Sequence, residues 1–335
     1  MLTKEELKAQ IRAMGIQASD TVLVHSALRA VGPVENGADG IIDAFKEVLT
    51  DGLLLIPTHT WSVVTKKQTL YDVRATVPNI GTLPRVAAFR PDGFRSLHPT
   101  HSVAGFGNNA AAFLAGEEAS GTPTPPGGAM HRLADVSAKI LLVGVGNDKN
   151  TFLHALDEEI NVPDRLEANG YDLTVLDQKG NAHVTHFRSH HCSRSKDVSM
   201  NYPNYERALV ETGAQRFGKL GNATVRIVDA AKCREVVLRI LSRADRDLCV
   251  EPMEIPEEFY KYENREVTPG FSYTSDRSSA VMPTKRGSAP TPGCRSSVRT
   301  PKSAASRPCF RRFPWRQRTQ NSAAAAKTSA PATRR

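Results

Sequence analysis

Three short apolar runs, each followed by small or polar residues, constrain the fold of this chain most. They are residues 21–25 (TVLVH), 52–57 (GLLLIP) and 139–145 (KILLVGV). Short apolar runs bounded by turn residues are typical of strands buried on both faces. A helical pattern at 37–49 separates the first two runs, and strand, helix and strand with short connections predict a parallel sheet.

Ligands bind beyond the carboxyl ends of parallel strands, and His25 and His59 fall at two of these ends. Further helices are expected at the amino terminus, starting near Thr3, and at 81–89, 108–115, 150–159, 202–212 and 230–241, with a strand at 223–228. Residues 171–176 and 182–188, separated by DQKG, predict a β-hairpin. Residues 61–78 lack a regular pattern and are expected to form a long surface loop.

We therefore predict an α/β protein: a single large domain, residues 1–263, with a mainly parallel central sheet flanked by helices plus a β-hairpin. The segment 264–335 is rich in Arg, Ser, Ala and Pro, and we expect it to be a disordered basic tail. That tail holds 12 Arg and 3 Lys against two acidic residues, a net charge of +13. Because the whole chain carries +9, residues 1–263 carry −4.

The net positive charge of the chain thus lies in the tail, and it does not indicate that the domain needs nucleic acid for its activity. The five cysteines form no C-x-x-C pair, which argues against a zinc knuckle or a disulfide framework. No apolar run approaches 18 residues, so no membrane partner is expected. We expect a cytoplasmic protein, and the sequence leaves its oligomeric state open.

Two segments dense in histidine and small residues indicate an active site built from loops. One is 98–107 (HPTHSVAGFG), and the other is 146–154 (GNDKNTFLH), which follows the third apolar run. His154 is the first choice for a general base because imidazole titrates near neutral pH. Asp157 and Glu158 lie about one helical turn further on, where a carboxylate can orient the ring. A helix-terminal histidine beside two solvated acids is the alternative interpretation of this spacing.

These segments, together with HSALRAVG at 25–32, resemble the aminoglycoside 3-N-acetyltransferase family over about residues 2–250. The resemblance implies acetyl transfer from acetyl-CoA to an amino group of an aminoglycoside, at the 3-N position, or of a similar cationic amine. It implies direct attack with His154 as general base. The family has an acidic residue, usually Glu, three positions after this histidine. That position is Asp157 here, so either Asp157 or Glu158 serves.

The resemblance also implies roles for loop residues. Asp72 matches a family carboxylate that takes part in catalysis and substrate binding, and His98 and His101 are expected to bind the substrate. An acidic residue of the family's later hairpin is replaced by the run 188–192 (RSHHC). Neighbouring side chains of an extended segment point to opposite faces, so only one histidine of this pair is expected in the site. His191 is the catalytic candidate.

Acetyl-CoA is the expected co-substrate, and backbone amides at loop starts can hold its phosphates. No G-x-G-x-x-G follows the first strand, and no serine or cysteine stands in a nucleophile elbow. The positions that match the family's cofactor-contacting segments are Ser26, Leu28, Val31, Gly32, Pro57, Thr58, Thr60, Ser102 and Val103.

Three alternatives remain at this stage. The first is a metal-assisted hydrolase built on the histidines, although no H-E-x-x-H pattern occurs and no metal is expected. The second is an N-acyltransferase that acts on a non-antibiotic amine. The third is a non-catalytic binding protein that works through its basic tail. The favoured partners are a small-molecule amine and acetyl-CoA.

Overall fold

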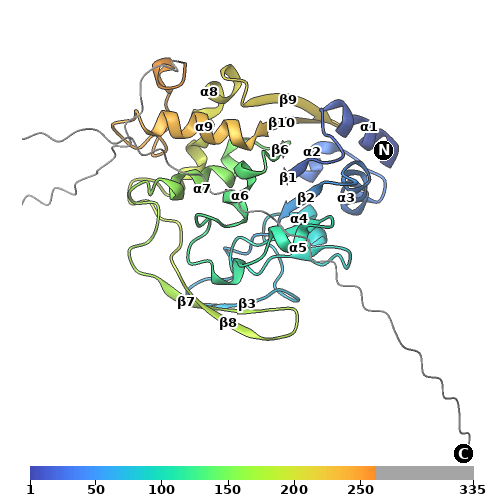
Figure 1. The fold of residues 1–335 in the computed structure, drawn as a ribbon, viewed down its shortest axis with the longest axis horizontal. Helices are drawn as coiled ribbons and strands as arrows, with labels where there is room; N and C mark the ends of the chain where they lie inside the picture. Colours follow the sequence, from blue (N-terminus) through green and yellow to red (C-terminus); the bar gives the residue numbers. More distant parts are fainter. Residues whose placement is uncertain (262–335) are drawn as a thin grey trace, which may run out of the picture. The chain divides into compact units, whose positions relative to one another are not determined.

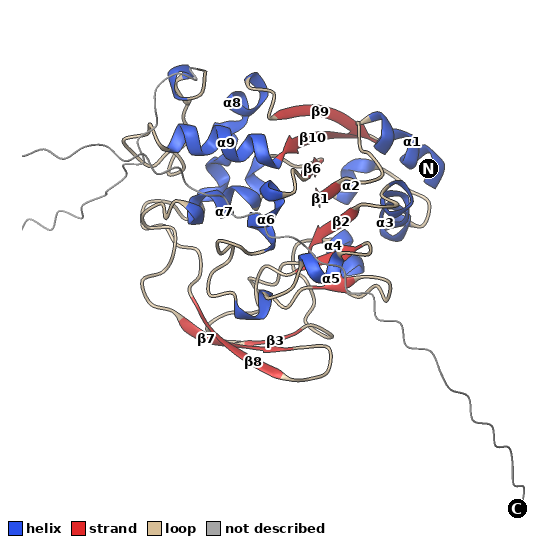
Figure 2. Cartoon of the chain, in the orientation of Figure 1, coloured by secondary structure: helices blue, strands red, loops and turns tan. Residues whose placement is uncertain are grey.

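The computed structural model describes residues 1–261 and is centred on a seven-stranded sheet (Figures 1 and 2). Its three middle strands are the three apolar runs and lie parallel to one another. The flanking strands pair antiparallel, and the two edge strands reverse direction again, so five of the seven share one direction. The spatial order is β4 (Phe94–Arg95), β5 (Val103–Phe106), β2 (Leu53–Pro57), β1 (Thr21–Ser26), β6 (Lys139–Val143), β10 (Ala223–Asp229) and β9 (Gln215–Leu220).

Alternate side chains of the central strands enter two different cores. In β1, Val22 and Val24 pack into one core and Leu23 into the other. In β6, Leu141 and Ile140 divide in the same way. Successive side chains of a strand point to opposite faces, so a strand covered on both faces must be apolar at every position. This is why the middle strands appear in the sequence as unbroken apolar runs.

Helices cover both faces of the sheet and complete three layers (Figure 2). One face carries α1 (Lys4–Ala13), α2 (Leu28–Val31), α3 (Gly37–Val48) and α4 (Thr82–Ala88). The other carries α5 (Ala110–Phe113), α6 (Ala129–Asp135), α7 (Phe152–Glu159), α8 (Glu206–Glu211) and α9 (Ala230–Leu241). Thr3 begins α1 with a capping box to Glu6, as its sequence position predicts. The α/β fold class is confirmed.

A second, three-stranded sheet lies apart from the central sheet (Figure 1). The predicted hairpin is confirmed as β7 (Tyr171–Leu176) and β8 (Ala182–Phe187). Its turn is held by Asp177, whose carboxylate accepts hydrogen bonds from the backbone of Lys179 and Asn181. β3 (Leu70–Asp72) pairs parallel to β7. The prediction of a structureless loop at 61–78 was therefore wrong at β3.

Other differences follow from short or polar elements. β9 is mostly polar, and α6 is only seven residues long, so neither stands out in the sequence. The expected helix at 202–212 is divided into a 3₁₀ helix, η3 (Val198–Tyr205), and α8, with Pro203 inside η3. The remaining 3₁₀ helices are η1 (Glu117–Ala119), η2 (Asn147–Lys149) and η4 (Glu257–Phe259). Within residues 1–261, no helix combines the length and apolarity needed to cross a bilayer. The predicted tail, 264–335, lies outside the described residues.

Candidate active site

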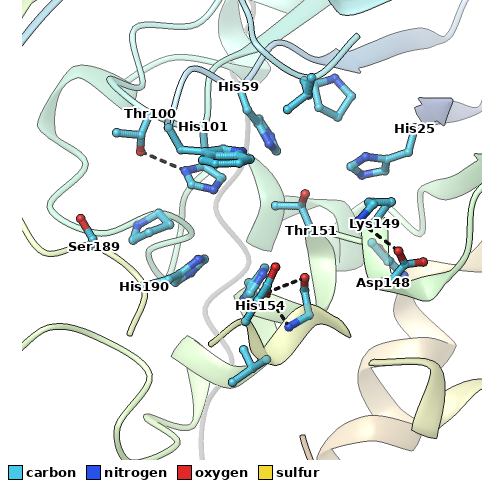
Figure 3. A pocket seen from close by; sticks show the side chains of 18 of the residues that line it. His25, His59, Thr100, His101, Asp148, Lys149, Thr151, His154, Ser189 and His190 are labelled. Carbon is cyan, nitrogen blue, oxygen red and sulfur yellow. Dashed lines mark hydrogen bonds and ion pairs between the residues drawn. The ribbon is translucent and has the colours of Figure 1, made fainter. Parts of the chain in front are cut away.

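A pocket of about 580 Å³ opens where the three central strands end (Figure 3). His25 and Ser26 end β1, and Pro57 and His59 lie at and just beyond the end of β2. Residues 148–151 follow β6 and line the same pocket. The expectation that polar groups at these strand ends meet is confirmed. The loops after β1 and β6 come together at the pocket only because the end of β6 packs closely against α2.

Gly144 makes this close approach feasible. Its φ is +67°, and an added Cβ would lie 2.5 Å from the Cβ of Ala30 in α2. Only glycine adopts such a backbone conformation freely and also leaves that space empty. The loop after β1 and the loop after β6 can therefore lie side by side at the pocket.

The segment 98–102 joins β4 to β5 and is locked by buried hydrogen bonds. The hydroxyl of Thr60 donates to the carbonyl of Pro99 at 2.8 Å. The Nδ1 atom of His98 accepts the backbone N–H groups of Thr100 and His101, so its Nε2–H donates to the carbonyl of Thr122 at 3.1 Å. Because both nitrogens of His98 are used within the protein, His98 shapes the loop, while His101 lines the pocket.

His154 lies near the start of α7, half-buried and lining the pocket (Figure 3). Its Nδ1 atom lies 2.7 Å from the hydroxyl of Tyr202, and that hydroxyl donates to Oδ2 of Asp157 at 2.9 Å. Tyr202 has a single proton to give, so it accepts the Nδ1–H of His154. The Nε2 atom of His154 then carries a lone pair, which is the tautomer that a general base needs.

An arginine fixes the far end of this array. The Nε atom of Arg165 donates to Oδ2 of Asp157 at 2.8 Å, and its two terminal nitrogens each bind Asp247 at 2.7 Å. Arg165 and Asp157 are both almost fully buried. Burial raises the pKa of Asp157, although the charge and hydrogen bond of Arg165 oppose that rise. The guanidinium of Arg165 thus holds the buried carboxylate of Asp157 where it accepts the hydrogen bond of Tyr202.

Glu158 does not contact His154 but binds a second histidine. Its Oε1 atom accepts the backbone N–H and the hydroxyl of Thr124, at 2.9 and 2.6 Å, and lies 3.2 Å from Nε2 of His190. His190 in turn stacks against His154. Burial alone would raise the pKa of Glu158, but its hydrogen bond and charge interaction with His190 lower the pKa overall.

Burial favours the neutral form of four histidines that line the pocket, His25, His59, His101 and His154. It lowers the pKa of His25 to about 4. It also lowers the pKa values of His59, His101 and His154 well below their ordinary range, and the neighbouring imidazoles add to that decrease. A neutral imidazole can accept a proton, so His154 is in the form that base catalysis requires.

Several residues singled out from the sequence lie elsewhere. Asp72 is the last residue of β3 and does not line the pocket; its carboxylate binds the side chain and backbone of Arg74. His191 reaches the pocket, but its ring lies 3.3 Å from Asp164, so the histidine beside His154 is His190 and not His191. Both histidines line the pocket, so the expectation that only one of them enters the site was wrong, and a catalytic role for His191 stays a prediction.

The residues assigned to acetyl-CoA divide into three groups. Ser26 and Pro57 line the pocket, whereas Leu28 and Gly32 line a separate shallow hollow. The other five residues are buried and do not line the pocket: Val31, Thr58, Thr60, Ser102 and Val103. Two of them, Thr58 and Ser102, hydrogen-bond to one another through their hydroxyls at 2.9 Å.

Sequence reasoning missed Tyr202 and Arg165. Neither belongs to a motif. Tyr202 lies far along the chain from its partner Asp157, and Arg165 lies beyond the end of α7, the helix that carries Asp157. It also missed the wall formed by Trp61 and the hairpin residues Tyr171 and Phe187. Within the described part of the chain, no three His, Cys, Asp or Glu side chains are arranged to hold a metal ion.

Comparison with known proteins decides the family. The family model described as aminoglycoside 3-N-acetyltransferase matches residues 23–242. The chain belongs to this family. Aminoglycoside N(3)-acetyltransferase IV of a Salmonella species is 27% identical over 245 residues, which cover 73% of this chain and 88% of that protein. Aminoglycoside N(3)-acetyltransferase III of Serratia marcescens is 26% identical over 253 residues, 69% and 93% of the two chains.

Solved structures of the family share the fold. Aminoglycoside acetyltransferase AAC(3)-IVa, crystallised as a variant in complex with a gentamicin, has a TM-score of 0.62 at 26% identity and covers 72% of this chain and 89% of its own. AAC-IIIb with coenzyme A has a TM-score of 0.60 at 21% identity, covering 70% and 93%, a likeness of fold alone. As a member of this family, the chain is an acyltransferase enzyme.

Proposed function

We propose that this chain transfers acetyl from acetyl-CoA to a primary amine by direct attack, with His154 as the general base. The observation that supports this is the array from His154 through Tyr202 to Asp157. It leaves the Nε2 atom of His154 unprotonated at the edge of the pocket. Arg165 holds the carboxylate at the other end.

The proposed reaction conserves atoms and charge. The amine nitrogen attacks the thioester carbonyl and gives a proton to Nε2 of His154; the C–N bond forms as the C–S bond breaks. The imidazolium is stabilised by Asp157 through Tyr202, and it returns its proton to the departing coenzyme A sulfur. Hydroxyls of Ser26 and Thr151 and the ammonium groups of Lys149 and Lys196 line the pocket and can bind the donor.

The relatives provide the first acceptors to test. Their names specify aminoglycosides and the N(3) position, so the 3-amino group of an aminoglycoside is the acceptor that kinship favours. A non-antibiotic amine is the alternative, and the same chemistry at His154 serves both. The base and the acceptor are therefore tested separately.

The base is tested with His154→Ala, by following release of coenzyme A thiol with acetyl-CoA and a panel of amines. We expect turnover to fall about 100-fold or more, with coenzyme A affinity nearly unchanged. His186→Ala is the matched control, because His186 is an exposed histidine of β8 that binds Asp172 outside the pocket. Unchanged turnover in His154→Ala would remove the central assignment.

A further inference from the structure

One carboxylate that lines the pocket has no ion-pair partner among the described residues. Two acids of the described chain line the pocket, Asp148 and Asp197. Asp148 pairs with Lys149 at 3.0 Å, whereas Asp197 lies in no ion pair within residues 1–261. A carboxylate that faces a ligand pocket without a counter-ion can bind a cationic group of the ligand.

The acids just behind the pocket are already engaged within the protein. Asp157 pairs with Arg165 at 2.8 Å, and Oε1 of Glu158 lies 3.2 Å from Nε2 of His190. Both acidic side chains are buried. An ammonium group of a ligand would have to displace these partners before it bound either acid. Asp197 is therefore the carboxylate that the fold leaves open to such a group.

The two oxygens of the Asp197 carboxylate are used unequally. Oδ1 accepts the backbone N–H and the hydroxyl of Ser199, at 3.0 and 2.7 Å, and so caps η3. Oδ2 accepts no hydrogen bond from the part of the chain that the structure describes. Because each carboxylate oxygen has two lone pairs, Oδ2 can bind a ligand while Oδ1 maintains the cap.

The cap also fixes the position of Asp197 relative to the proposed base. η3 carries Tyr202, whose hydroxyl contacts Nδ1 of His154. Val198 and Tyr202 are buried in the core, which anchors η3. Asp197 and His154 line the same pocket, so one ligand can contact both.

An acceptor with several amino groups needs a carboxylate of this kind. Acetylation removes the charge of the reacting nitrogen alone, so each other ammonium group stays charged and loses part of its hydration in the pocket. Lys149 and Lys196 carry the positive charge of the lining, but the proposed function gives them to the donor, whose phosphates balance that charge. Asp197 remains for the acceptor.

We propose that Oδ2 of Asp197 binds a second ammonium group of the acceptor while the reacting amine lies at His154. This inference rests on the proposed acetyl transfer and names a residue that determines its acceptor specificity. Asp72, the acid expected from sequence to bind the substrate, lies outside the pocket and binds Arg74, so η3 supplies the carboxylate instead. An acceptor with two or more ammonium groups gains an ion pair that a monoamine lacks.

The test removes the charge of Asp197 and keeps its cap. In Asp197→Asn the side-chain oxygen still accepts both hydrogen bonds of Ser199, because asparagine caps helices as well as aspartate does. Gentamicin, spermidine and phenylethylamine are compared as acceptors for the full chain, by coenzyme A thiol release in saturating acetyl-CoA.

We expect the KM of the preferred polyamine to rise about fivefold to tenfold in Asp197→Asn, with kcat and the KM of acetyl-CoA nearly unchanged. Added salt should raise this KM more in the wild-type chain than in the variant, because salt screens the ion pair that the variant lacks. A monoamine makes no such pair, so the KM of phenylethylamine should stay the same.

Asp229→Asn is the matched control. Asp229 also caps a helix, α9, by accepting the backbone N–H of Lys232. It lies opposite Lys139 at the start of β6, the end of the sheet away from the pocket, so its loss of charge should leave KM unchanged.

Three results would overturn the inference: an unchanged polyamine KM in Asp197→Asn, equal rises in both variants, or preference of the wild-type chain for phenylethylamine over both polyamines. Thiol release no faster than acetyl-CoA hydrolysis with every amine tested would overturn the proposed function itself.

Discussion

His154 and His190 stack face to face, with ring centroids 4.0 Å apart and ring planes inclined by 22°. Two imidazolium ions at this separation repel strongly, so charge on one disfavours charge on the other. Burial and then the neighbouring His190 lower the pKa of His154. The stack therefore helps to hold the proposed base in its neutral form.

This arrangement predicts the acidic limb of the pH–rate profile. In the proposed mechanism neutral His154 is the active form, so its lowered pKa should keep turnover high below pH 6.5, the ordinary pKa of histidine. His190→Asn removes one cause of the lowering and should move the acidic limb of kcat upward, toward the ordinary value. His186→Asn is the control and should leave the limb in place. An unmoved limb in His190→Asn would argue against coupling between the rings.

Tyr202→Phe is expected to reduce kcat while the fold persists. It removes the hydroxyl that receives the Nδ1–H of His154, so the ring loses its fixed tautomer. The loss of one such hydrogen bond corresponds to about tenfold to a hundredfold in rate. Tyr205→Phe is a matched control, because Tyr205 is equally buried but its hydroxyl contacts Cys249. Equal losses in both variants would indicate a general packing effect.

Arg165→Met should destabilise the domain severely. Arg165 lies between Asp157 and Asp247, and its removal leaves the buried Asp157 without a counter-ion and Asp247 with only the exposed Arg194. Breaking a buried pair in this way costs about 3–5 kcal/mol. Urea denaturation followed by circular dichroism measures the loss. Arg207→Met removes an exposed pair with Glu211 and should leave the midpoint nearly unchanged.

Glu117 predicts a pH dependence of stability. Burial raises the pKa of this carboxyl from 4.5 to about 7, although its hydrogen bond from the backbone of Ala129 opposes the rise. The folded chain thus binds a proton that the unfolded chain releases, so the stability contribution falls as pH rises from about 4.5 to 7. Glu117→Gln should remove this decrease and raise the free energy of unfolding at pH 8 by up to about 3 kcal/mol. A variant that is less stable at pH 8 would contradict the assignment.

The sequence predicted the centre of the fold better than its edges. β1, β2 and β6 are buried on both faces, so their composition alone identified them. β9 (QRFGKL) is an edge strand with polar and glycine positions, and it forms because β10 pairs with it. β3 has three residues and depends in the same way on β7.

The site shows the same division. The loops that carry His101 and His154 follow recognisable segments, and the pocket brings them together. Tyr202 and Arg165 reach Asp157 from other elements, and no periodicity or motif records such a contact. The Tyr202 hydroxyl bridges Asp157 and His154 with one hydrogen bond to each. Only the folded chain reveals that bridge.

The pocket has walls from two sheets with separate cores. The three-stranded sheet packs Tyr71, Leu173 and Phe187 into its own small core, apart from the two cores of the central sheet. The proposed base, His154 on α7, depends on the central sheet, whereas Tyr171 and Phe187 reach the pocket from the hairpin. Ser189 and His190 follow β8 and line the pocket as well, and His190 stacks on His154. Substitutions in the hairpin core are therefore expected to reshape the pocket wall, whereas substitutions just after β8 also affect the proposed base.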